Sequence, residues 1–120
     1  MVLKNYEDRL GFLNRNIDKI NKAVSNFLGF NVNFAVRTFQ RSNNVMEITL
    51  VDDSNIKDKC GVMSKCFEWV HLADFGIWWD DDVVYITIDC NWRHIGGGSN
   101  GTTICKVYIV GDEVSVRSVG

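Results

Sequence analysis

The chain has 120 residues, a length typical of one domain, and 46% hydrophobic and 23% charged residues place it among ordinary folded proteins. This composition excludes the class of disordered chains with low hydrophobicity and high charge. A formal net charge of -2 gives no overall attraction to nucleic acid or to an anionic membrane. We therefore expect a single domain over residues 1–120, with no nucleic-acid partner and no membrane partner.

Apolar runs are short throughout the chain. No run reaches the length of about 18 residues that spans a bilayer, and the first residues lack the apolar stretch of a signal peptide. We therefore expect a soluble, cytoplasmic protein, in which Cys60, Cys66, Cys90 and Cys105 stay reduced and mostly buried. The absence of proline and the frequency of asparagine, lysine and isoleucine are consistent with an AT-rich bacterial or phage genome, and so with a bacterial host cytoplasm.

An amphipathic helix is predicted over residues 3–28. Apolar residues recur there at alternating spacings of three and four, which places them on one stripe of a helix. They are Leu3, Tyr6, Leu10, Leu13, Ile17, Ile20, Val24 and Phe27. Gly29 follows as a stop signal. Because the flanking positions lack the paired charges of a coiled coil, we expect this helix to pack on its own sheet.

Strands are predicted along the rest of the chain. The alternating segments 32–40 and 45–51 flank the polar turn RSNN and predict a β-hairpin. Residues 52–59 form a predicted polar loop, and in 60–76, where helix and strand are both open, we favour a helix near 62–73. β-branched and aromatic residues dominate 77–79, 83–92, 102–110 and 113–118. The predicted fold class is α+β: a long N-terminal helix packed on a small antiparallel meander, with one short middle helix.

The predicted loop RHIGGGSNG, at residues 93–101, is unusually rich in glycine. Glycine backbone adopts positive dihedrals, and successive N–H groups can converge on a phosphate or carboxylate. Trp92 can stack on a base and Arg93 can hold a phosphate. The alternative is that this segment is only a flexible hairpin loop. Arg117 is added as a second cation, although strand register alone does not place it beside the loop. The candidate ligand-binding residues are Trp92, Arg93, Gly96, Gly97, Gly98, Ser99, Asn100, Thr102 and Arg117.

Other residue patterns do not favour catalysis or a metal. The cysteines lack the close pairs of a structural zinc site. Cys90 and Cys105 lie in predicted strands, where burial is expected rather than an exposed, activated thiolate. The consecutive carboxylates of residues 80–82 form a tight turn and cannot all converge on one cation. We therefore expect a binding protein that is not an enzyme and needs no metal and no cofactor.

Two neighbouring tryptophans indicate an interface. Trp78 and Trp79 point to opposite faces of a strand, so at most one lies in the main core. The other is either covered, under the N-terminal helix or in a second small core, or exposed, as tryptophans at binding surfaces are. Because the helical stripe and the tryptophans exceed what one small sheet covers, we expect a homodimer or a higher homo-oligomer.

The segment WRHIGGGSNGT at 92–102, with the long N-terminal helix and the small sheet, resembles the Thoeris anti-defence family of phage proteins. Members of this family bind cyclic ADP-ribose isomers between subunits without cleaving them. The resemblance implies a phage or prophage counter-defence protein that sequesters such a nucleotide, with Trp92, Arg93 and residues 96–102 in contact with it. The alternative is a small inhibitor of a bacterial immune effector, similar to anti-CRISPR proteins, that uses exposed aromatic residues such as Trp78 or Trp69 as hot spots.

Overall fold

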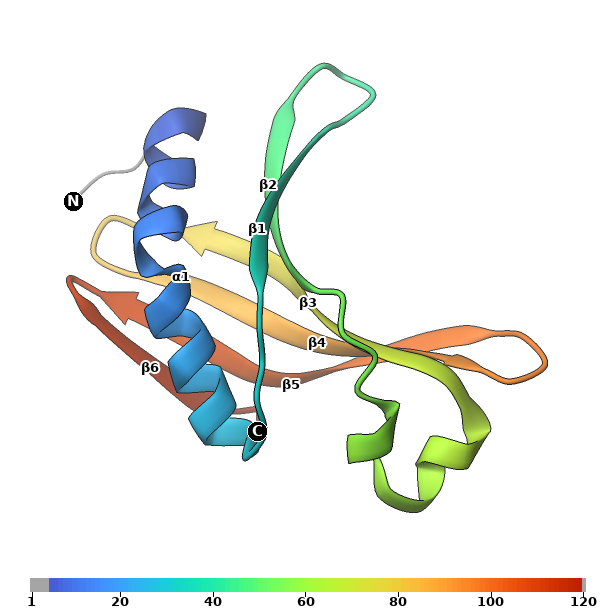
Figure 1. Ribbon diagram of the computed structural model, residues 1–120. Coiled ribbons are helices and arrows are strands. Elements are labelled where there is room, and N and C mark those ends of the chain that lie inside the picture. Colours follow the sequence, from blue (N-terminus) through green and yellow to red (C-terminus); the bar gives the residue numbers. More distant parts are fainter. Residues whose placement is uncertain (1–4, 120) are drawn as a thin grey trace.

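The computed structural model describes residues 5–119 as one long helix on a six-stranded antiparallel sheet, with the strands in sequential order (Figure 1). The helix α1 spans Tyr6–Leu28. The strands are β1 (Ala35–Gln40), β2 (Met46–Asp52), β3 (Phe67–Trp79), β4 (Val84–His94), β5 (Ser99–Val110) and β6 (Glu113–Ser118). Two short 3-10 helices, η1 (Lys57–Lys59) and η2 (Gly61–Cys66), join β2 to β3. The predicted α+β class and the antiparallel meander are confirmed.

Local hydrogen bonds define both ends of α1. The side chain of Asn5 accepts a hydrogen bond of 2.8 Å from the N–H of Asp8 and so caps the first turn. Gly29 adopts a left-handed conformation with φ of 83° and donates its N–H to the carbonyl oxygen of Ser25, which ends the helix where the sequence predicts. Leu3, the first residue of the predicted stripe, lies outside the described residues.

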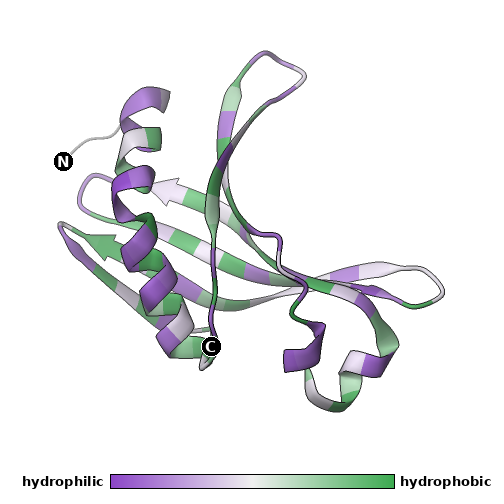
Figure 2. Cartoon of the chain, viewed as in Figure 1, coloured by the Kyte–Doolittle hydropathy of each residue, from purple (hydrophilic) through white to green (hydrophobic). Residues whose placement is uncertain are grey.

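The main core lies between α1 and one face of the sheet. Three residues of the predicted stripe, Leu13, Ile20 and Val24, are fully buried. The facing sheet residues alternate along their strands, a pattern that Figure 2 shows as alternating hydropathy on β4 and β5. They include Leu50, Leu72, Ile86, Ile88, Cys105, Val107 and Ile109. Phe27, the last apolar residue of the stripe, stays exposed, whereas Leu28, four residues after Val24, packs against the core.

The segment between α1 and β1 is tied back to the helix. The Asn21 side chain bonds both backbone groups of Phe34, accepting from its N–H at 2.5 Å and donating to its carbonyl oxygen at 3.1 Å. The Ser25 hydroxyl accepts a 2.8 Å hydrogen bond from the N–H of Val32. These bonds use backbone groups that would otherwise extend the ladder, so β1 begins at Ala35 rather than at residue 32.

The predicted helix near residues 62–73 is wrong. Only Gly61–Cys66 is helical, as the 3-10 helix η2, and β3 then runs without a break from Phe67 to Trp79. Register shifts in the pairing of β3 with β4 occur between Phe67 and Trp69 and between Asp74 and Gly76. Each bulge adds one residue and reverses the in-and-out alternation. The sequence therefore loses the period of two that would have identified a strand.

Two tight turns match their sequence signals. Gly111 has a positive φ of 60°, whereas Asp112 does not, which is the pattern of a type II′ turn with glycine first between β5 and β6. The acidic link after β3 closes by a hydrogen bond from the N–H of Asp80 to the carbonyl oxygen of Val83. Within residues 5–119, no helix combines the length and the hydropathy that a membrane span requires.

Candidate functional site

The glycine-rich segment is the tip of a long β-hairpin rather than a broad loop. Of the predicted loop 93–101, residues 93–94 belong to β4 and 99–101 to β5, which leaves only residues 95–98 as the turn. Gly96, Gly97 and Gly98 all have positive φ, between 89° and 110°. His94 closes this turn, accepting from the N–H of Gly97 and donating to the carbonyl oxygen of Gly98. The three glycines thus have a local structural role in reversing the chain.

The structure places Trp92 and Arg93 on opposite faces of β4, because neighbouring residues of a strand alternate. The Trp92 ring packs on Phe67, with ring centroids 5.8 Å apart. The guanidinium of Arg93 pairs with the carboxylate of Glu68 at 3.0 Å. One ligand bound on either face therefore contacts only one of these two predicted site residues directly.

Arg117 is not brought to the glycine turn. It pairs in register with Lys106, whereas Arg93 pairs with Ser99, seven residues away along β5. At about 3.3 Å per residue this separates the two arginines by roughly 23 Å. The guanidinium of Arg117 lies 4.4 Å from the centroid of the Tyr108 ring.

The remaining predicted site residues lie on the exposed end of β5. Asn100 pairs with Trp92 and Thr102 with Cys90 across the ladder. The Asn100 side chain accepts a 2.8 Å hydrogen bond from the N–H of Gly101. The structure thus brings Arg93, Ser99 and the glycine turn together on one hairpin. None of them lines the cavities of about 640 Å³ and about 270 Å³ in the described part of the chain.

The thiols of Cys90 and Cys105 lack the features of nucleophiles. Burial raises the pKa of Cys105 to about 11, and burial, with smaller contributions from Cys60 and Asp89, raises the pKa of Cys90 to about 11. Both thiols are therefore protonated at neutral pH. Among residues 5–119, no three His, Cys, Asp or Glu side chains are grouped so that they could hold a metal ion.

The sheet forks between β2 and β3, and this fork provides a different candidate site. These strands pair only at Val51 with Ala73 and Asp52 with Leu72. Beyond this point β2 diverges from β3, and the β1–β2 hairpin projects away from the body (Figure 1). A cavity of about 640 Å³ lies between the diverging strands. We call the space between residues 46–49 of β2 and 74–79 of β3 the forked groove; Tyr6 and Arg9 of α1 also line it.

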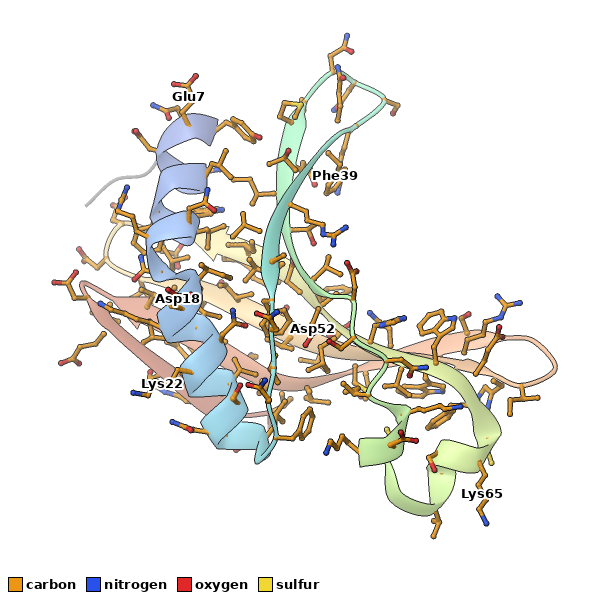
Figure 3. All side chains as sticks on the ribbon, in the orientation of Figure 1. Glu7, Asp18, Lys22, Phe39, Asp52 and Lys65 are labelled. Carbon is orange, nitrogen blue, oxygen red and sulfur yellow. The ribbon has the colours of Figure 1, made fainter. Side chains whose placement is uncertain are left out.

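The base of the hairpin is held firmly. Asp52, labelled in Figure 3 where the hairpin joins the rest of the sheet, is only 2% exposed. Its carboxylate accepts hydrogen bonds of 2.9 Å from the N–H groups of Asn33 and Ser54. Next to Asp52, Asp53 forms an ion pair with Arg37 of β1. The fork therefore starts at a fixed point rather than at a frayed end.

Exposed apolar side chains gather around the forked groove. Phe75, at the second bulge of β3, is 72% exposed and Trp78 is 37% exposed. The hairpin adds Phe39, labelled in Figure 3, together with Val45 and Met46, all of them exposed. A concentration of large apolar side chains on one surface marks an interaction site.

The groove-facing edge of β2 is unpaired. In an antiparallel strand each residue directs its N–H and C=O to the same side, and neighbours alternate. The N–H of Arg41 donates to the carbonyl oxygen of Val45, so the odd-numbered residues of β2 face β1. The backbone groups of Met46 and Ile48 consequently point into the forked groove, where no strand of the described chain pairs with them.

The opposing edge of β3 is unpaired in the same way. The hydrogen bond from Asp80 to Val83 shows that the even-numbered residues at this end of β3 face β4. The backbone groups of Ile77 and Trp79 therefore point into the forked groove. Two free strand edges thus face one another across a cavity.

Asp74 occupies the apex of the fork. Its Oδ1 atom accepts hydrogen bonds of 2.6 Å from the Thr49 hydroxyl and from the N–H of Leu50. The carboxylate thereby takes the place of the backbone acceptor that would continue the β2–β3 ladder. Burial raises the pKa of Asp74 above its ordinary value, while these hydrogen bonds act in the opposite direction.

The predicted separation of the two tryptophans is confirmed. Trp79 packs on Phe12 of α1 at 6.0 Å between ring centroids, beneath the helix. Trp78 lies on the other face and stacks on Tyr85 at 5.2 Å with an interplanar angle of 6°. Tyr85 in turn lies 6.1 Å from Tyr108. These three rings form an aromatic row that ends at the forked groove.

No protein-family model, no curated protein and no solved structure matches this chain. The site is therefore assigned from geometry. Sequence reasoning singled out Trp78 but missed Phe75 and the two open edges. One signal pointed there: Gly76 lies within a run of strand-forming residues, and such a glycine often marks a bulge or a close approach.

Proposed function

We propose that the protein acts by binding another protein at the forked groove and does not catalyse a reaction. The observation that carries this proposal is the pair of facing, unpaired strand edges beside exposed Phe75 and Trp78. Unpaired edges invite pairing with another chain, and natural proteins normally cover or charge them. An edge that stays open next to large apolar side chains is a feature of surfaces that bind polypeptide.

The electrostatics of the groove support a polypeptide partner over an anionic nucleotide. Arg41 forms an ion pair of 2.7 Å with Glu47. Arg9 lies over the Trp79 ring, 5.2 Å from its centroid, and Asp74 adds a negative group at the apex. A site for a doubly charged phosphate ligand would need an excess of cations. The groove instead offers neutral backbone donors and acceptors together with apolar surface.

The biological setting that we propose is the protein-binding alternative expected from the sequence: a phage or prophage inhibitor of a bacterial immune effector in the host cytoplasm. Support for protein binding comes from Trp78, which was expected as a hot spot and borders the groove. Support for the counter-defence setting comes from the resemblance of residues 92–102. Sequestration of a cyclic ADP-ribose-type nucleotide by the glycine hairpin is the competing proposal.

Copurification from bacterial cells, followed by reconstitution from purified components, tests the proposal. We expect a stoichiometric protein partner whose affinity, measured by calorimetry, falls at least about tenfold in Phe75→Lys. The matched control is Val62→Lys on η2, an equally drastic change at a residue that is 88% exposed and outside the groove. Equal affinities for the two variants would place the interface elsewhere and contradict the proposal.

A thermal-shift panel of cyclic ADP-ribose isomers examines the competing proposal. A ligand at a hundredfold excess over its dissociation constant stabilises the folded state by about 2.7 kcal/mol. A shift of that size, lost in Arg93→Ala and retained in Phe75→Lys, would favour nucleotide binding at the hairpin. We expect no such shift.

A further inference from the structure

We infer that the partner contributes an extended, otherwise unstructured segment, which inserts as a strand between β2 and β3. This inference rests on the proposed function and specifies the chemistry of the partner. The groove presents backbone donors and acceptors on both walls, from Met46 and Ile48 on one side and Ile77 and Trp79 on the other. A chain in the β conformation carries matching groups on both of its own edges.

The occupant needs both strand edges free, which argues against a folded second copy of this chain. Every strand in the described part of the chain is already paired on at least one side. The outermost strands β1 and β6 each offer only one free edge. Such a strand can satisfy one wall of the forked groove, and the other wall stays open. A linear segment satisfies both.

The direction and length of the segment follow from the fork. Because β2 and β3 are antiparallel, one inserted strand runs antiparallel to one wall and parallel to the other. The free edge of β3 extends from the bulge at Asp74 and Gly76 to the turn at Asp80. A segment of about five or six residues spans this edge at about 3.3 Å per residue.

The two faces of the groove differ, so the segment should alternate in character. On the α1 side, the side chains of Ile48, Ile77 and Trp79 pack against the core and present apolar surface. On the other side the groove is bordered by Trp78 and by the polar side chains of Glu47 and Thr49. Apolar residues at every second position would therefore face α1, and the intervening positions tolerate polar residues.

Selection from a displayed library of random twelve-residue peptides tests the inference. The immobilised full chain is the target, and peptides that also bind Phe75→Lys are discarded. We expect the remaining peptides to share apolar residues at alternate positions. Their affinity should be unchanged for Val62→Lys and should fall at least about tenfold for Met46→Pro. Proline there removes an N–H that faces the groove, at the first residue of β2, where strands accept proline.

Backbone N-methylation of one selected peptide supplies the decisive readout. Methylating one N–H at a time should weaken binding at least about tenfold at each residue of the inserted part, because the N–H groups of successive residues face β2 and β3 in turn. Losses confined to every second residue would show pairing with one wall only, and that result or an absence of losses would overturn insertion between β2 and β3 while leaving a protein partner at the groove intact. If no selected peptide depends on Phe75, the inference and the proposed function both fail.

Light scattering at micromolar concentration tests whether a second copy of the chain occupies the forked groove instead. We expect the forked groove to be unoccupied in the purified chain, so that the association state of Phe75→Lys equals that of the unmodified protein. A dimer that dissociates in Phe75→Lys but persists in Val62→Lys would show that a second copy covers the groove. That result would overturn the inference.

Discussion

Gly76→Ala should displace the Trp78 indole from the aromatic row. A β-carbon built at Gly76 would lie 2.6 Å from Cη2 of Trp78 and 3.0 Å from its Cζ3 atom. Such distances are too short for carbon atoms, but the clashing atoms are the far end of a side chain that can rotate. The backbone at Gly76 does not have a positive φ, so alanine itself causes no conformational strain there.

The energetic cost of this displacement follows from the contacts that Trp78 would lose. Its stack on Tyr85 is close to parallel, and such aromatic pairs contribute about 0.5 to 1.5 kcal/mol beyond area burial. Glycine-to-alanine replacement also stabilises a protein by about 0.4 to 1 kcal/mol through the unfolded state. The two effects oppose each other, so the stability of Gly76→Ala alone does not measure the energy of the lost Trp78–Tyr85 contact.

A double-mutant cycle isolates the contact. Urea unfolding of the unmodified protein, Gly76→Ala, Trp78→Ala and the double variant should give a coupling energy of about 1 kcal/mol. In the Trp78→Ala background, Gly76→Ala should be neutral or slightly stabilising. Equal effects of Gly76→Ala in both backgrounds would show that the indole does not lie over Gly76, and the described border of the forked groove would be wrong.

Further predictions concern Thr87, Asp74 and the cysteines. The buried hydroxyl of Thr87 has no hydrogen-bond partner among residues 5–119, so Thr87→Val should raise the free energy of unfolding by about 1 kcal/mol in thermal denaturation. Asp74 has a raised pKa in the folded state, so the folded state holds this proton more tightly than the unfolded chain does. Stability should therefore fall as the pH rises from the ordinary carboxyl pKa through the raised one, and Asp74→Asn should remove this slope. Iodoacetamide at pH 8 should label exposed Cys66 in the folded protein, whereas Cys90 and Cys105, with pKa values of about 11, should react only after denaturation, as mass spectrometry would show.

The elements that could be predicted are those whose signals are local. The three-and-four spacing of α1, the stop at Gly29 and the type II′ turn at Gly111 depend on neighbours within a few residues. The strands β4 to β6 were recognisable because β-branched and aromatic residues dominate their segments. β3 was partly missed because its two bulges reverse the alternation, and the strand then resembles a short helix.

The candidate site was harder to predict because it is formed by the parts of β2 and β3 that do not pair with each other. The sequence marks the strands β2 and β3, but the length over which they pair is a property of the assembled sheet. The glycine cluster drew the first prediction because glycines are costly in folding entropy. In the structure that cost is associated with a tight four-residue turn, and the adjacent residues Trp92 and Arg93 diverge to opposite faces of β4.

Three features at the branch point indicate that the fork is a specific structure and not incomplete pairing. Asp74 binds the N–H of Leu50 and so replaces the ladder bond that would begin to close the fork. The adjacent bulge changes the direction of β3, and Gly76 leaves the space that the Trp78 ring occupies. Each feature is locally unfavourable, since it buries a carboxylate, interrupts a ladder or places glycine in a strand. Such local conflicts concentrate at functional sites. All three coincide where the two strands separate, and the binding role that we propose for the open groove would account for them together.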